Sequence, residues 1–173
     1  MSDKNPIDGL DSMVSPETAI SELPDPQIMI DKALEILSQS SVSFELSELV
    51  STQGLRINVI NTPQEVTYAP ESKDVYIGVT SFNPTYPAKF ILLVADALLE
   101  AQLEIEGFKQ PELTEAKEKY VTAMATRKAK KVARLCAIAF DLDQKEQFEG
   151  YHFVDEMHKL GHNEAMDVFV NNI

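Results

Sequence analysis

The scarcity of cysteine and glycine limits the chemistry available to this chain. Its single cysteine, Cys136, excludes an intrachain disulfide and a cysteine-based metal knuckle, and its apolar neighbours are typical of a buried small hydrophobe. The six glycines form no glycine-rich loop between a strand and a helix, which excludes the common phosphate-binding loops. No complete catalytic or cofactor motif is present, so we expect no cofactor.

Positive charge is also scarce. The chain has 15 lysine and arginine residues against 28 aspartate and glutamate residues, which gives a formal net charge of -13. Such a charge repels phosphates and anionic lipids, so we expect neither nucleic acid nor a membrane as a partner. The imbalance is concentrated at the front, where residues 1–50 hold ten carboxylates and two lysines.

Long apolar runs are absent as well. The most apolar stretch, residues 90–103, is interrupted by Asp96 and Glu100, whereas a membrane span needs about 20 largely uncharged residues. It is predicted to be a buried helix. The first six residues are polar and lack the basic start of a secretory signal. We therefore expect a cytoplasmic protein that folds alone or as a homo-oligomer.

The remaining sequence has an ordinary globular composition, 44% hydrophobic and 25% charged, over 173 residues. Residues 1–24 are predicted to be a flexible acidic leader, and residues 25–173 a single, mainly helical α+β domain. Apolar periodicity and cap residues such as Asp25 and Thr114 predict helices over 26–38, 43–52, 88–106, 115–141, 144–160 and 164–170. Alternating apolar residues predict strands over 55–60, 65–68 and 75–79, which we expect to form a three-stranded antiparallel meander.

Two groups of polar residues are candidate sites. His158 and His162 have the spacing of two metal ligands on one helical face, although Gly161 between them is expected to end the helix; the alternative is a pair of exposed histidines at a helix end. A second group, in an otherwise acidic chain, is a basic helical face that could bind an anion. Its alternative is a solvated face paired with carboxylates. The basic face consists of Arg127, Lys131 and Arg134.

The order of elements from Val66 onward resembles the core of the zincin-like metallopeptidases. A strand, a turn, a second strand and a loop precede an apolar helix, and a second long helix with alanine-rich turns follows. In those families the first of these helices carries an HExxH motif, in which two histidines hold zinc and the glutamate activates a water molecule.

The residues that carry this chemistry are replaced here. The segment Val94-Ala-Asp-Ala-Leu-Leu-Glu-Ala101 falls where the family has its motif, so that Asp96 and Glu100 stand at the histidine positions and Ala97 at the glutamate position. The resemblance therefore implies a degenerate member without the catalytic base. Asp96 and Glu100 are candidates for a weak magnesium or calcium site, or for pairing with Arg127 or Lys131.

Three functions remain open from the sequence. The first is a non-catalytic, zincin-like scaffold that binds a protein or peptide along an edge strand of the meander, with Val75, Tyr76, Ile77 and Val79 as the binding residues. The second is an unrelated acidic adaptor that engages a basic partner through its helical surface or its leader. The third is a metal-dependent hydrolase with an atypical site at Asp96 and Glu100.

Overall fold

The structure is a computed structural model that describes residues 25–63, 66–79, 87–114 and 116–172. The described part is mainly helical with one small sheet, which confirms the α+β class in outline. The leader predicted for residues 1–24 lies outside the described residues. In chain order the elements are α2 (Pro26–Ser38), α3 (Phe44–Gln53), β1 (Arg56–Ile60), β2 (Val66–Ala69), β3 (Asp74–Gly78), α4 (Pro87–Ile105), α5 (Lys117–Asp143), a short 3-10 helix η1 (Glu146–Phe148), α6 (Phe153–Lys159) and α7 (Asn163–Asn171).

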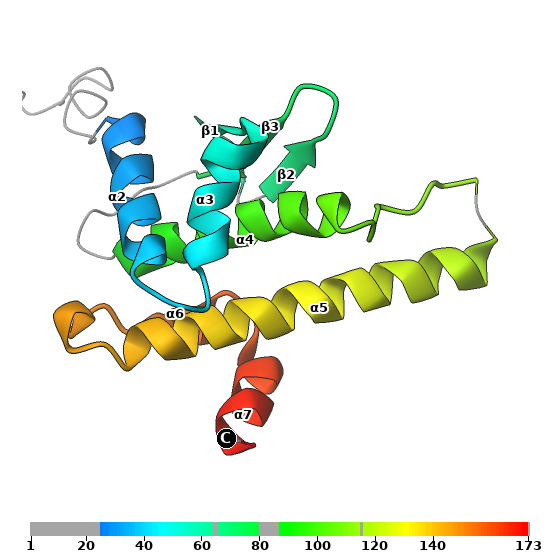
Figure 1. Cartoon of the computed structure of the whole chain (residues 1–173). Helices are drawn as coiled ribbons and strands as arrows, with labels where there is room; N and C mark the ends of the chain where they lie inside the picture. Colours follow the sequence, from blue (N-terminus) through cyan, green and yellow to red (C-terminus); the bar gives the residue numbers. More distant parts are fainter. Residues whose placement is uncertain (1–24, 64–65, 80–86, 115, 173) are drawn as a thin grey trace, which may run out of the picture.

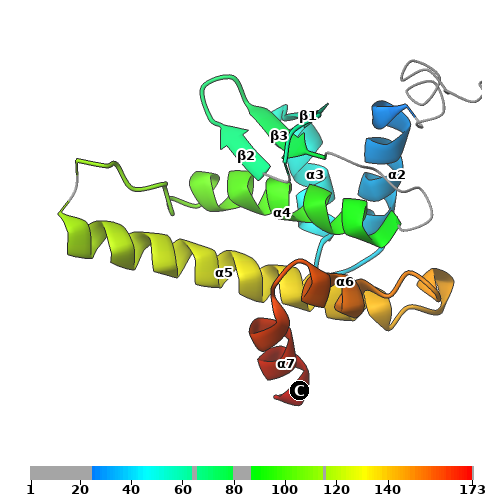
Figure 2. The same ribbon diagram turned by 180° about the vertical axis from the view of Figure 1, so that it is seen from behind.

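Helix α4 is the centre of the fold. Figures 1 and 2 show α4 and α5 lying side by side, with α2, α3 and the sheet on the side of α4 away from α5, and with α7 projecting from the opposite side of α5. Most residues of α4 are buried, as predicted from its apolar composition. Among the described residues no helix is both long and apolar enough to cross a membrane.

Helix α2 begins, and helix α3 ends, where the cap residues predict. Asp25 precedes α2 and its side chain accepts a hydrogen bond of 2.9 Å from the backbone N–H of Gln27, while Pro26 occupies the first helical position. Gly54 ends α3 with a left-handed backbone, φ 65°. The helices α2 and α3 pack on each other and on α4, and so complete one side of the core.

The predicted antiparallel meander is wrong. The strands have the order β1-β3-β2, in which β1 runs parallel to β3 and β2 runs antiparallel to it. The strand predicted to be an edge, which carries Val75, Tyr76 and Ile77, is therefore the central one, and Val75 and Ile77 are fully buried. β1 and β2 form the two edges. The three strand positions were recognisable from alternation, but their order depends on which strand buries more apolar surface on α4.

The hydrogen bonds at the two ends of β1 define which backbone groups of β2 point away from β3. The N–H of Arg56 donates to Lys73 O and the N–H of Val79 donates to Ile60 O, so the odd-numbered residues of β3 direct their backbone groups toward β1. The even-numbered residues of β3, Asp74 and Tyr76, then direct their backbone groups toward β2, where they oppose Ala69 and Thr67. The backbone groups of the two alternate β2 residues, Val66 and Tyr68, point outward.

The C-terminal region departs from two predictions. Residues 144–160 do not form one helix, because Gly150 and His152 both have positive φ, 92° and 54°, which breaks the helical path before α6. The predicted N-cap Thr114 does not cap α5 either: its hydroxyl donates to Glu112 at 3.3 Å, and α5 begins after Ala116. The terminal helix and its preceding break at Gly161, φ 86°, agree with the prediction.

Candidate functional site

A cluster of charged side chains joins α4 to α5. On α4, Asp96, Glu100 and Glu104 follow one another at intervals of four residues, which places them on one helical face. On α5, Arg127 and Lys131 have the same spacing and meet them. We call these five residues the interhelical charge cluster. It holds three carboxylates and two cations, and the side chains are 9–19% exposed.

Lys131 lies between two carboxylates of the cluster. Its Nζ is 2.6 Å from Glu100 Oε1, where it donates a hydrogen bond, and 2.9 Å from Asp96 Oδ1, where the distance is that of an ion pair but the angle is not that of a hydrogen bond. Burial raises the pKa of Asp96, and Lys131 only partly opposes this. Burial also disfavours the ionised Glu100, but the hydrogen bonds from Lys131 and Arg127 outweigh it and lower the pKa of Glu100.

The guanidinium of Arg127 is fully engaged. Its Nε donates to Glu100 Oε2 at 3.2 Å, one terminal nitrogen donates to Glu100 Oε2 at 2.6 Å and to Glu100 O at 3.1 Å, and the other donates to Glu104 Oε2 at 3.2 Å and to the carbonyl of Phe108. These contacts account for all five N–H groups of an arginine side chain. Arg127, 7% exposed, therefore has no free donor for an external anion.

The third residue of the predicted basic face is also paired with α4. Arg134 donates to Gln102 Oε1 at 3.0 Å and forms a two-pronged contact with the carboxylate of Glu106 at 2.7 and 3.0 Å. The face therefore matches the second interpretation, in which it pairs with carboxylates. Sequence reasoning identified the cations, and the four-residue spacing of the carboxylates on α4 could have identified Glu104 as well.

A hollow of about 340 Å³ lies between β2 and the charge cluster. We call it the β2 hollow. Strand and turn residues form one wall, and side chains of α4, α5 and the loop between them form the other. The residues that line it are Val66, Thr67, Tyr68, Pro70, Glu100, Glu104, Gln110 and Arg127.

Glu104 brings negative charge to the β2 hollow. Its Oε2 accepts hydrogen bonds from Arg127 and from the backbone N–H of Gln110, both at 3.2 Å, whereas its Oε1 has no hydrogen-bond partner among the described residues. The pKa of Tyr68 is raised by burial and, in addition, by the negative charge of Glu104. The Tyr68 hydroxyl and the Glu104 carboxylate are therefore close enough to interact electrostatically.

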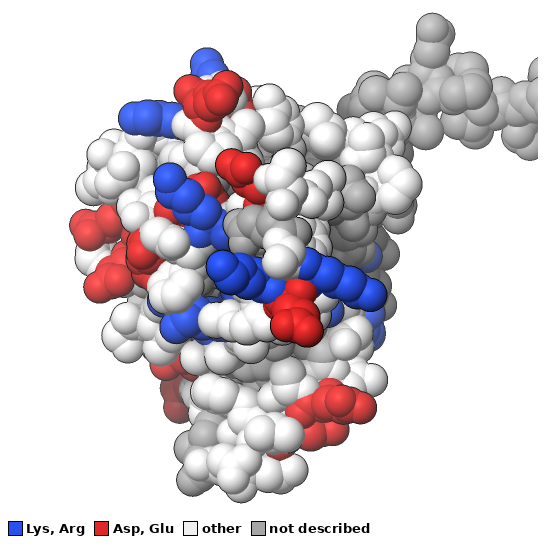
Figure 3. Space-filling model, turned by 90° about the vertical axis from the view of Figure 1, so that its right-hand side faces the viewer, with Lys and Arg blue, Asp and Glu red and all other residues white. Residues whose placement is uncertain are grey.

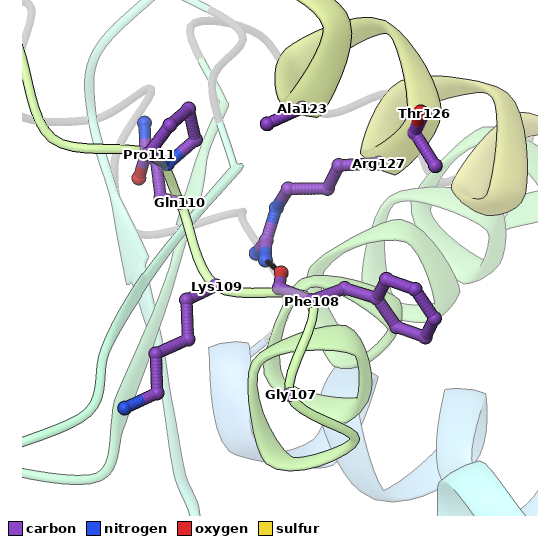
Figure 4. Close-up of a pocket in the computed structure, with 8 residues that line it drawn as sticks. All are labelled: Gly107, Phe108, Lys109, Gln110, Pro111, Ala123, Thr126 and Arg127. Carbon is purple, nitrogen blue, oxygen red and sulfur yellow. Dashed lines mark hydrogen bonds between the residues drawn. The ribbon is translucent and has the colours of Figure 1, made fainter. Parts of the chain in front are cut away.

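A second hollow, of about 320 Å³, lies on the other side of Arg127, under the loop that joins α4 to α5. Figure 4 shows the Arg127 side chain reaching the backbone of Phe108, while the side chain of Lys109 points away from the guanidinium. Seen from this end of the molecule, Lys and Arg side chains are prominent on the surface (Figure 3). The two hollows share Arg127 and Gln110.

The histidine candidates do not converge with the carboxylates into a ligand set. His158 Nε2 lies 3.2 Å from Asp167 Oδ1 and so links α6 to α7. His162 precedes α7, and its charge interacts with Asp96 and Lys131. Within residues 25–63, 66–79, 87–114 and 116–172, no group of three or more His, Cys, Asp or Glu side chains has an arrangement that could hold a metal ion. Asp96 and Glu100 share a cation, and this cation is Lys131.

Fold and site together define a mainly helical α+β protein in which an edge strand borders a polar hollow beside an ion-paired helix pair. Comparisons of the chain with protein-family models, with curated proteins and with solved structures found no match.

Proposed function

We propose that this protein is a non-catalytic binding protein that holds an extended peptide segment along the free edge of β2. The observation that carries the proposal is the position of the outward-pointing backbone groups of Val66 and Tyr68 beside the β2 hollow. An extended segment can pair with such groups as an additional strand, while its side chains enter the adjoining pocket. The segment predicted from the sequence, residues 75–79, is replaced by β2 because β3 is flanked on both sides.

The charge cluster supports a binding role over a hydrolytic one. A general base needs a carboxylate that can accept a proton from water, but Glu100 is held by Lys131 and Arg127, which lowers its pKa. Burial raises the pKa of Asp96, but this carboxylate lies 2.9 Å from the ammonium of Lys131, with which it forms an ion pair. The residue at the position of the zincin glutamate, Ala97, is fully buried and carries no ionisable group. The zincin-like ancestry itself stays a proposal. The order of a strand followed by α4 supports it, although that strand, β3, is central in the sheet and not at its edge.

An array of immobilised heptapeptides with systematically varied sequences tests the proposal. Val66→Pro removes an outward N–H but keeps a side chain of similar size, whereas Val66→Ala keeps the N–H and removes two methyl groups. A larger loss of binding in Val66→Pro therefore reports on the backbone donor. For peptides that the wild type binds, we expect Val66→Pro to weaken binding about tenfold, as the loss of one well-made hydrogen bond predicts, and Val66→Ala to weaken it much less. An array without binders, or equal effects of both variants, would contradict edge-strand binding.

The acidic adaptor is the second candidate, because the net charge of -13 attracts basic partners and residues 1–50 carry most of the excess. Deleting residues 1–23 distinguishes the two. The edge-strand proposal expects the truncated chain to bind the same peptides as the whole chain. If the protein is instead an acidic adaptor, capture of its basic partner should fail after truncation and should be unaffected by Val66→Pro.

A further inference from the structure

We propose that the β2 hollow selects a lysine or arginine side chain of the bound segment, at the position directly opposite Tyr68. This inference rests on the proposed function, since it assigns a chemical class to one side chain of the peptide that β2 would hold. It commits to a cationic peptide and excludes an acidic or phosphorylated one.

The geometry of strand pairing defines which peptide side chain enters the hollow. Directly opposed residues of neighbouring strands direct their side chains to the same face of a sheet. Tyr68 and Val66 face α4, because they pair with the fully buried Val75 and Ile77 and pack against the core. A peptide residue opposite Tyr68 therefore points toward the hollow, and its two sequence neighbours point to the other face, beside the exposed Thr67.

The charges that line the hollow favour a cation. Two glutamates and one arginine contribute to its walls. All N–H groups of Arg127 are engaged, and both oxygens of Glu100 are held by Lys131 and Arg127. Glu104 Oε1 is without a partner among the described residues, and Gln110 and Tyr68 add polar groups beside it. An ammonium or guanidinium could pair with Glu104, whereas a peptide carboxylate would meet negative charge.

The volume suits one long side chain. About 340 Å³ accommodates a lysine or arginine side chain with a few water molecules, and the apolar stem of such a side chain can pack on the ring of Tyr68 while its charged end reaches polar groups. Most residues that line the hollow belong to β2, α4 and α5, and only Pro70 and Gln110 lie outside strands and helices, so most of its walls belong to regular elements.

The test is a peptide scan on the heptapeptide array, with the position opposite Tyr68 occupied in turn by lysine, arginine, norleucine and glutamate. We expect lysine or arginine to bind at least about tenfold more tightly than norleucine, which has a similar apolar stem without charge. Moving the lysine by one position should abolish the preference and moving it by two should restore it in part, because side chains alternate between faces.

Two variants locate the selectivity. Glu104→Gln keeps the shape of the side chain and should reduce the preference for lysine to about twofold or less. Glu106→Gln, directly after the end of α4 and paired with Arg134, is the matched control and should leave the preference intact. Equal binding of lysine and norleucine, a preference for glutamate, or a preference unchanged in Glu104→Gln would overturn the inference. If Val66→Pro loses binding but the wild type shows no preference for lysine, edge-strand binding is retained and only the cation selectivity is rejected. If the array contains no binders, both proposals are rejected.

Discussion

Lys131 Nζ lies 2.6 Å from Glu100 Oε1 on the facing helix, and both side chains are less than one-fifth exposed. This contact joins the two longest helices of the described chain at the middle of the charge cluster. Ions in such surroundings lose much of their hydration. Removing either partner therefore leaves the other charge without compensation and destabilises the fold.

Replacing Lys131 with methionine retains the apolar stem and removes the charge. Asp96 and Glu100 then lose their shared cation, and we expect the free energy of unfolding to fall by about 3 kcal/mol, as for partly buried ion pairs that lose one partner. Lys128→Met, at an exposed position of the same helix, should change it by less than about 0.5 kcal/mol. Urea denaturation measures both, and equal effects would contradict the role assigned to Lys131.

The position of Lys131 between Asp96 and Glu100 also leads to a prediction for metal titration. Zinc, manganese, magnesium or calcium would have to displace an ammonium that already contacts Asp96 and Glu100, so we expect calorimetry to detect no stoichiometric binding. The variant with Asp96→Ala and Glu100→Ala is the control. Stoichiometric binding by the wild type that disappears in this variant would restore the hypothesis of a metal-dependent hydrolase.

The stability of the fold should depend on pH through His162. Burial lowers the pKa of its imidazole below 6.5; Asp96 opposes this shift, and Lys131 and Lys128 add to it. The unfolded chain thus takes up a proton at higher pH than the folded chain, so this contribution to stability is present above pH 6.5 and is lost as the pH falls through the folded-state pKa. We expect His162→Gln to flatten the dependence of unfolding free energy on pH below 6.5. An unchanged slope would show that His162 does not contribute.

Amide hydrogen exchange tests the order of the sheet. The N–H groups of Thr67 and Ala69 point to β3 and those of Val66 and Tyr68 point outward, so we expect the outward pair to exchange at least about tenfold faster. In an antiparallel meander β2 would be the central strand and all four would be protected. Two-dimensional NMR spectra recorded during exchange distinguish these patterns residue by residue.

The start of α6 depends on a long-range cap. The carboxylate of Asp143 accepts a 2.8 Å hydrogen bond from the backbone N–H of Phe153, ten positions later. Asp143→Ala should lower the free energy of unfolding by about 1 kcal/mol, the usual effect of removing a helix cap. Glu149→Ala, at an exposed neighbouring position, is the control. Thermal denaturation of the two variants should separate them by several degrees.

The elements that sequence analysis predicted well are those whose signals are local. The apolar period of α4, the cap at Asp25 and the stop at Gly54 each act within one or two helical turns. The elements that it missed depend on distant partners. The break before α6 combines Gly150, a local signal that the prediction passed over, with the left-handed backbone of His152 and its accompanying cap Asp143, and no local pattern predicts these last two.

In the candidate site, too, the features with local signals were predicted and those that depend on distant partners were not. The shared face of Arg127 and Lys131 followed from helical spacing, and pairing with Asp96 and Glu100 was one of the alternatives that the sequence left open. The location of the free edge did not follow, because strand order is decided by packing between segments that are distant in sequence. Tyr68 was therefore not recognised as a residue of the site.

The position of β3 between two earlier strands has a consequence for folding. β2 and β3 are joined by the short turn at 70–73 and can pair early, whereas Arg56 of β1 and Asp74 of β3 are 18 positions apart and must close a longer loop. We expect the hairpin to form first and β1 to join it afterward. Until β1 joins, the edge of β3 that faces β1 has unpaired backbone groups. The chain is therefore most prone to aggregation during this interval of synthesis or refolding.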